Sequence, residues 1–441
     1  MANIVNFGSS FIVGFILPAV LSVAAYGHYK EYTLYLSFVY IFNIGFNDGI
    51  YIKYGGEEPD KINKKTLHEE HNFIRIFQFI IFIPMIIYSI VTRDMVVLLF
   101  SVSTLFMTIN TYHQNYYQAV GNFKVFSNGN IFKSVFYIFS LLFGVFILKS
   151  DQYVLYISLS VLSYILVFLY YEYIFYKTYG FKNEWNLNGK FSLFKIGFIV
   201  LFANMSLTFV GNVGNWVVNL GFDIEEFAQY SFQNSILNVL LLIVNAVGMV
   251  FYNIISKKEN QSMLRLTKRI SIFLGILGGL GFFVFKYIIE TYLSNYVSAL
   301  PLLSVTFIAI PYIMVSKILI ANLYKARKNE RKYFRDSILF AVGSFIIVFS
   351  TYLLTHSLLA IAFSTTVSYI IWFLYTTRVE YSYLKSSNKE LFLLVSHIAV
   401  FYYSAVSFSI PVGFFIYLVY VFLVAIAFKK ELTGLVKFTK N

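Results

Sequence analysis

An apolar run that begins near Tyr32 contains the segment Ile44-Gly-Phe-Asn-Asp-Gly-Ile-Tyr-Ile-Lys-Tyr-Gly-Gly56. Within this segment an acid, Asp48, is followed closely by a base, Lys53, with an amide at Asn47. A charged residue inside an apolar run is costly and is a functional candidate by default. The fold therefore depends on whether the runs around this segment cross a membrane, and on which side the segment lies.

The composition favours a membrane protein. Of the 441 residues, 59% are hydrophobic and only 12% are charged, whereas soluble domains carry roughly a quarter charged residues. Apolar runs of about twenty residues, the length that spans a bilayer as a helix, recur from end to end. The chain has no cysteine, which excludes disulfides and thiol nucleophiles. We predict an all-α polytopic membrane protein.

Unbroken apolar runs favour helices over a membrane barrel, whose strands alternate in polarity. Residues 1–8 contain no lysine or arginine, so the first run is expected to be a retained helix and not a cleaved signal peptide. The pattern predicts fourteen spans: 4–24, 32–52, 73–92, 95–117, 127–148, 153–176, 193–220, 228–256, 269–289, 297–322, 333–354, 357–377, 391–408 and 411–428.

The basic residues orient these spans. With fourteen spans, 29 of the 34 lysines and arginines fall on the side of the even-numbered connections and the C-terminus, 4 fall on the other side, and Lys317 lies within a span. Basic residues that flank spans stay in the cytoplasm. Both termini are therefore predicted to be cytoplasmic, and Lys53 lies at the cytoplasmic mouth of the second span. No connection is long enough for a soluble catalytic domain.

Two short matches predict an internal repeat. Residues 31–35 resemble residues 226–230, and residues 117–124 resemble residues 324–331, each pair displaced by six spans. An even displacement gives two halves of the same orientation, as in some transporter folds. We predict two six-helix lobes followed by two extra helices, with the divisions 1–190, 191–380 and 381–441.

Several spans carry polar stripes at helical spacing. Amides that face lipid are costly, so these faces must meet protein or water. One interpretation is helix packing, and the other is a shared polar cavity between the lobes, which would suit a sugar. The candidate substrate-binding residues are Lys317, Lys53, Asp48, Asn47, Asn212, Asn215, Asn219, Asn234, Asn238 and Asn245.

The charged candidates have different expected roles. Lys317 lies roughly 9 Å inside the cytoplasmic boundary at 1.5 Å per residue, where it could bind an anion or extend its ammonium group toward water. Asp48 and Lys53 lie five positions apart and do not share a helix face, so Asp48 is expected to find a partner on another helix or to line the cavity mouth. Gly55 and Gly56 are expected to end the second span.

Catalytic chemistry is poorly represented. The segment His68-Glu-Glu-His71 lies in a charged connection and is expected to be solvated, and His113 is expected to be packed. Glu172, Lys133 and Lys195 are expected to anchor helix ends. The spans carry no set of residues for nucleophilic or general acid–base catalysis. We therefore expect no enzyme activity, no cofactor, no metal site and no nucleic-acid partner.

Three links resemble those of the polysaccharide-exporter flippases. These are Tyr26–Tyr35 with Gly45–Gly56, then Leu220–Ser231, and Tyr117–Lys124. The resemblance implies the multidrug/oligosaccharidyl-lipid/polysaccharide exporter fold in the bacterial inner membrane. It implies flipping of undecaprenyl-diphosphate-linked O-antigen or capsule precursors, with membrane lipids, a polysaccharide polymerase and a chain-length regulator as partners. The chain departs from the cationic cavity of that family, because Lys317 is its one deep base.

Two other functions remain open. A cation-coupled multidrug exporter of the same superfamily would require a deep carboxylate for the coupling ion. A membrane-embedded polymerase or acyltransferase would require a large outer loop or deep catalytic side chains.

Overall fold

The computed structural model describes residues 12–257, 260–327, 329–429 and 431. The chain divides into two compact units, Met1–Asn212 and Val213–Asn441. The described residues form helices and no strands, which confirms the all-α fold class. Among the described residues, nine helices are long and apolar enough to cross a membrane, or up to eleven if each of two bent pairs forms one span.

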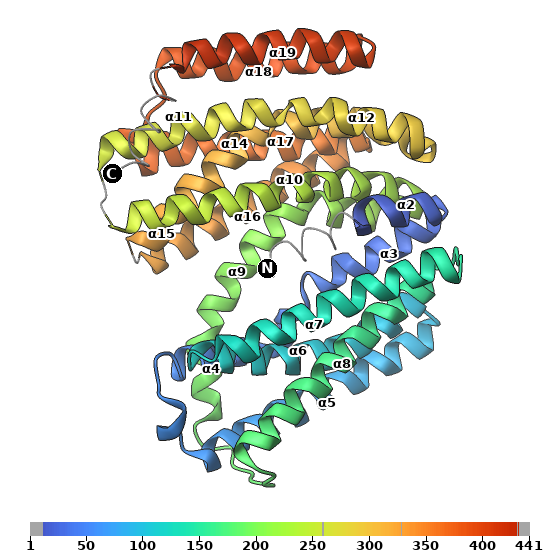
Figure 1. Ribbon diagram of the computed structural model, residues 1–441, viewed down its shortest axis with the longest axis vertical. Coiled ribbons are helices and arrows are strands. Elements are labelled where there is room, and N and C mark those ends of the chain that lie inside the picture. Colours follow the sequence, from blue (N-terminus) through green and yellow to red (C-terminus); the bar gives the residue numbers. More distant parts are fainter. Residues whose placement is uncertain (1–11, 258–259, 328, 430, 432–441) are drawn as a thin grey trace. The chain divides into compact units, whose positions relative to one another are not determined.

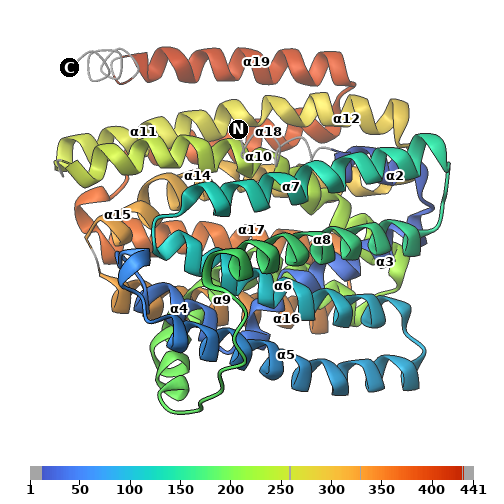
Figure 2. The same cartoon turned by 60° about the horizontal axis from the view of Figure 1, so that its bottom comes forward.

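Unit 1 is built around four long helices that lie side by side (Figures 1 and 2). Short polar connections and N-cap side chains set their ends; Asp94, for example, accepts from the backbone N–H groups of Val96 and Val97. Such an N-cap satisfies donors that the first turn leaves unpaired. The helices of this unit are α2 (Leu17–Val20), α3 (Val23–Leu36), α4 (Phe46–Lys53), α5 (Lys64–Thr92), α6 (Met95–Ala119), α7 (Phe123–Leu142), α8 (Tyr153–Tyr179) and α9 (Lys190–Gly221), which continues into unit 2.

Unit 2 contains the second set of helices. Its 294–324 segment bends by 49° between Ile308 and Ile310, next to Pro311, which removes a backbone donor from the helix. The helices are α10 (Ile224–Lys257), α11 (Gln261–Gly278), α12 (Leu280–Tyr292), α13 (Leu300–Ile308), α14 (Ile310–Met314), α15 (Ala321–Ala326), α16 (Glu330–Thr355), α17 (Leu358–Tyr375), α18 (Asn388–Ser407) and α19 (Ile410–Ala427).

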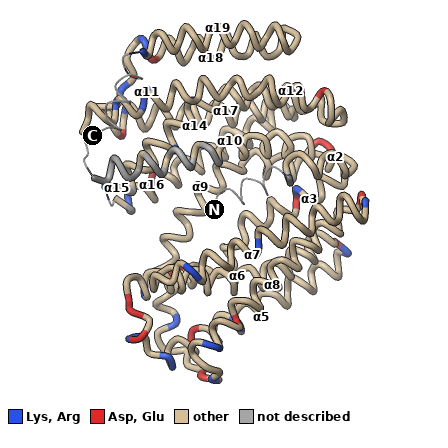
Figure 3. The backbone as a smooth tube through the Cα atoms, in the orientation of Figure 1, with Lys and Arg blue, Asp and Glu red and all other residues tan. Residues whose placement is uncertain are grey.

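The charged residues lie mainly near helix ends and in connections (Figure 3). In unit 1 they gather where α4 is joined to α5 and where α8 ends. The midsections of the helices are largely uncharged, as membrane-spanning segments require.

The first two predicted spans differ from the structure. The predicted connection at residues 25–31 is wrong, because α3 runs through it without a break. The chain turns instead at Leu21 and Ser22, where the Ser22 hydroxyl accepts from the backbone N–H of Ala25 at 3.2 Å. The predicted span 32–52 is also interrupted, because Ile44 and Gly45 adopt positive φ angles of 50° and 86°. Residues 4–11 of the first predicted span lie outside the described residues.

One of the two repeat matches recurs in local geometry. The N–H of Asn122 donates to the carbonyl of Tyr117 at 2.8 Å, and the N–H of Asn329 donates to that of Tyr324 at 3.2 Å. Both asparagines have a ψ of about 62° at the start of the next helix. The other match is not equivalent in structure, because Glu31 lies late in α3 whereas Glu226 lies in the first turn of α10. The three-part domain division stays a prediction.

Candidate functional site

The glycines of the opening segment lie at a close helix crossing within unit 1. Gly45 and Gly49 face Gly197 of α9, and a Cβ atom added at Gly45 would lie 2.5 Å from the backbone nitrogen of Phe198. A Cβ added at Gly49 would lie 2.8 Å from the carbonyl carbon of Leu193. Small residues four apart allow helix backbones to approach this closely in membranes. The crossing therefore explains the glycine spacing, and α4 ends at Lys53 shortly before Gly55 and Gly56.

The polar residues of the same segment point in different directions. Asn47 is fully buried, and its amide donates to the carbonyl of Thr108 on α6 at 2.9 Å. Asp48 is half-buried in the first turn of α4. The Lys53 ammonium donates to Glu70 at 2.5 Å and does not pair with Asp48. Contact of these three residues with a substrate stays a prediction.

The segment His68–His71, expected to be solvated, is buried. All four residues are at most 6% exposed, because α5 begins at Lys64 and carries them into the helix bundle. We call this segment the polar hub, since each side chain bonds to a different part of unit 1. His68 contacts the Tyr179 carbonyl at 3.2 Å, Glu69 pairs with Lys190 at 3.3 Å, Glu70 accepts from Tyr54 at 2.7 Å, and His71 bonds to Glu172 at 2.8 Å.

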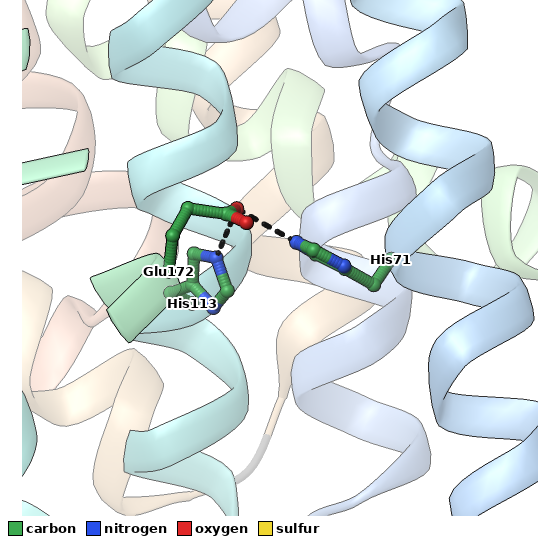
Figure 4. Close-up of side chains that lie close together, drawn as sticks. All are labelled: His71, His113 and Glu172. Carbon is green, nitrogen blue, oxygen red and sulfur yellow. Dashed lines mark hydrogen bonds and ion pairs between the residues drawn. The ribbon is translucent and has the colours of Figure 1, made fainter. Parts of the chain in front are cut away.

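Two histidine side chains of the bundle, His71 and His113, converge on one carboxylate oxygen of Glu172 (Figure 4). The Nε2 atoms of His71 and His113 lie 2.8 Å and 3.1 Å from Oε1 of Glu172, and all three residues are buried. Because a carboxylate only accepts, both imidazoles donate through Nε2. Glu172 is therefore not the helix-end anchor predicted above, and His113 is packed as predicted. We call these residues the Glu172 cluster.

The Glu172 cluster meets the first requirement of a metal site, because its three ligand atoms lie within 4.8 Å of one another. Two features of its surroundings oppose a bound cation. The Arg75 guanidinium lies 3.9 Å from the second oxygen of Glu172. The Nδ1 atoms of both histidines have no partner among the described residues, whereas metal-bound histidines almost always donate through their second nitrogen. The geometry favours a hydrogen-bonded cluster that ties α5, α6 and α8 together.

This interpretation predicts that metal removal leaves the protein unchanged. Prolonged treatment of the purified protein with a chelator should not shift its midpoint of thermal unfolding, since no ligand bond is lost. The matching measurement is the metal content by elemental analysis before and after treatment. A lowered midpoint that zinc alone restores would instead identify a structural metal site.

The predicted residues of α9 and α10 are distributed between the two units. In unit 2, Oδ1 of buried Asn215 accepts from the Ser231 hydroxyl at 3.2 Å, which joins α9 to α10. Asn219 and Asn234 are half-buried, and Asn238 is exposed. In unit 1, Asn212 donates to the Thr208 carbonyl at 3.0 Å.

The side chain of Asn245 lies outside the described residues. The hydrogen bond between Ser231 and Asn215 joins the α9 and α10 stripes, and a shared polar cavity stays a prediction.

Lys317 lies in a π-helical segment, Val315–Ile320, that follows α14. Its side chain is exposed although the residues around it are mostly buried. No described acidic residue forms an ion pair with it. π-Helical turns inside longer helices occur frequently at functional sites. This placement puts one basic side chain, Lys317, inside an otherwise apolar span.

The architecture of this chain is similar to that of solved membrane transporters. An inward closed conformation of the lipid II flippase MurJ matches with a TM-score of 0.68 and 14% identity, covering 98% of this chain and 99% of that chain. An inward-facing multidrug resistance MATE family transporter of the MOP superfamily matches with a TM-score of 0.54 and 13% identity, covering 88% and 96%. The chain has the MOP-superfamily fold.

A MOP-superfamily transporter from Pyrococcus furiosus also matches, with a TM-score of 0.50, 12% identity and coverage of 88% and 94%. No family model matches the chain, and no curated protein matches it in sequence. At identities of 12–14% these similarities establish the MOP fold and leave the substrate to be inferred.

Proposed function

We propose that this protein is a flippase for undecaprenyl-diphosphate-linked oligosaccharides in the bacterial inner membrane. The two lobes would rock against each other so that sugar and diphosphate cross a polar path while the polyprenyl tail stays in lipid. Outward movement of a negative charge from a negative interior is favourable by about 2.3 kcal/mol per charge per 100 mV.

The observation that carries this proposal is the extent of the structural match. The match to the lipid II flippase covers 98% of this chain and 99% of the flippase, whereas the match to the MATE transporter covers 88% of this chain. A lipid II flippase therefore shares nearly the whole architecture of this chain. The amides and tyrosines of the polar stripes support a sugar substrate, because hydroxyl groups require both donors and acceptors.

The carboxylates argue against a cation-coupled drug exporter. A coupling ion requires an available acid within the membrane, but the buried carboxylates that the structure describes are already bonded to basic or hydroxyl groups. These residues are Glu69, Glu70, Glu172, Asp336 and Glu390. Because these carboxylates are already bonded, they are also poorly placed to act as general acids or bases in a membrane-embedded polymerase or acyltransferase.

The proposal is tested in cells that depend on the gene for surface polysaccharide. Depletion of the protein should accumulate lipid-linked oligosaccharide on the cytoplasmic side and reduce surface polysaccharide. Drug sensitivity with unchanged surface polysaccharide would identify a multidrug exporter instead.

Replacement of Lys317 by alanine is expected to lower flipping roughly tenfold, which corresponds to about 1.4 kcal/mol. The reason is loss of the positive charge that would guide the diphosphate. The rate is measured in complemented cells from the accumulated lipid-linked sugar, with Lys195→Ala as the control because Lys195 is also exposed. Equal accumulation in both variants would remove Lys317 from the transport path.

A further inference from the structure

Unit 1 contains an amphipathic pocket that is lined by none of the predicted site residues. The pocket has a volume of about 420 Å³, which lies within the usual range of ligand sites. Its walls come from α5, α6 and α8 and from the connection that follows α8. Among the described residues that line it, Arg75 carries the one charge.

The lining changes from polar to apolar along α5. Asn72 and Arg75 lie toward the start of the helix, and Phe79 and Ile80 lie further along it. Asn72 and Ile80 are separated by eight positions, or about 12 Å of helix. On the antiparallel helices, Leu105, Phe106 and Phe168 extend the apolar wall, and the Phe106 and Phe168 rings are 5.2 Å apart. The pocket therefore has one polar end, at the predicted cytoplasmic face, and one apolar end within the membrane.

The polar end is fixed by contacts to the connection that follows α8. The Asn72 amide donates to the Glu184 carbonyl at 2.9 Å and lies 3.4 Å from the Lys182 carbonyl. These bonds hold Asn183, between the two carbonyls, at the pocket lining. The mouth thus combines one guanidinium with two amide side chains.

Arg75 retains unused donors. Its Nη1 donates to the Tyr176 hydroxyl at 2.7 Å, and its side chain is 40% exposed. A guanidinium has five N–H groups, and only the one bonded to Tyr176 forms a hydrogen bond among the described residues. Planar guanidinium groups bind phosphate oxygens with two parallel bonds. The mouth of the pocket therefore presents a phosphate-binding group directly above an apolar wall.

We propose that this pocket binds an anionic phospholipid of the cytoplasmic leaflet, with the phosphate at Arg75 and an acyl chain along Phe79, Ile80 and Phe106. The order of the lining matches the order of groups in a lipid, and the bilayer supplies the occupant. The positive charge is single and lies 3.9 Å from the Glu172 carboxylate, which suits one phosphodiester and not a diphosphate. None of the candidate substrate-binding residues lines this pocket.

The test uses the full-length protein in nanodiscs with equal parts of phosphatidylglycerol and phosphatidylcholine. Lipid retained after detergent extraction is measured by native mass spectrometry. The wild type should retain about five times as much phosphatidylglycerol as phosphatidylcholine, because one basic group near a membrane surface attracts an anionic lipid by about 1 kcal/mol. Arg75→Gln should abolish this preference. Lys177→Gln should keep it, because Lys177 is exposed near the same end of α8 and does not line the pocket.

A second variant keeps the test independent of the Glu172 cluster. Leu105→Trp retains Arg75 but fills the apolar end, and it should reduce the retained lipid of both kinds. Equal retention of the two lipids by the wild type, or an unchanged preference in Arg75→Gln, would overturn the proposal. Displacement of the lipid by inorganic phosphate alone would assign the pocket to a free anion and would also overturn it.

Discussion

Replacement of Glu390 by glutamine is expected to lower the free energy of unfolding by about 3–5 kcal/mol, the usual cost of removing one partner from a buried ion pair. Glu390 at the start of α18 pairs with Lys268 of α11 at 2.6 Å and with Arg269 at 2.7 Å. The Lys268 side chain is 1% exposed. Without the carboxylate, a buried ammonium would keep only neutral acceptors, the Leu384 carbonyl and the Ser386 hydroxyl.

The measurement is a denaturant titration of the protein in detergent. The matched control is Glu58→Gln, which removes an exposed pair with Lys61 whose side chains are 68% and 70% exposed. Exposed pairs contribute about 0–1 kcal/mol, so this control should unfold like the wild type. An equal loss of stability in both variants would contradict the claim that the Lys268–Glu390 pair stabilises the contact between α11 and α18.

The second large effect concerns the crossing of α4 and α9. Gly197→Ala should destabilise the protein by about 1–3 kcal/mol, the usual cost of overpacking. A Cβ atom at residue 197 would lie 2.5 Å from the backbone nitrogen of Gly49, so two helix backbones would have to separate. Transport should decrease with stability, because the crossing fixes the start of α9.

Gly211→Ala provides a control on the same helix. An added methyl group at residue 211 meets no atom of the described residues within 4 Å, and alanine is favoured over glycine in a helix interior by about 0.5–1 kcal/mol. The two substitutions are chemically identical and should have opposite signs in the same thermal unfolding experiment. Destabilisation by both would mean that α9 requires glycine for reasons other than this crossing.

The sequence predicted the long helices well because their signal is local. Each apolar run from α5 to α8 lies between short polar connections, so hydropathy alone determined these helices. The break at Gly45 was missed because it depends on Gly197 of α9, which lies far away in the sequence. The count of basic residues that oriented the spans does not depend on the residue at which α3 begins. It therefore did not reveal that the chain turns at Leu21 and Ser22 instead of at residues 25–31.

The polar hub was missed for a related reason. Its partners Tyr179 and Lys190 lie 111 and 121 positions away from His68 and Glu69, so no local pattern indicates burial. One local signal was present. Asn63 can cap a helix that begins before residues 68–71, so that these residues belong to the apolar periodicity of α5. Similarly, Glu172 and His113 each lie about two turns inside a helix end, where a charge or an imidazole requires a partner.

The central claim is tested most directly by flipping in proteoliposomes. The purified protein is reconstituted with a fluorescent undecaprenyl-diphosphate-linked oligosaccharide, and the fraction accessible to an impermeant quencher is followed with time. We predict rapid exchange between leaflets with wild-type protein and roughly tenfold slower exchange with Lys317→Ala. Exchange by the wild type no faster than in protein-free liposomes, under an imposed membrane potential, would contradict the proposed function.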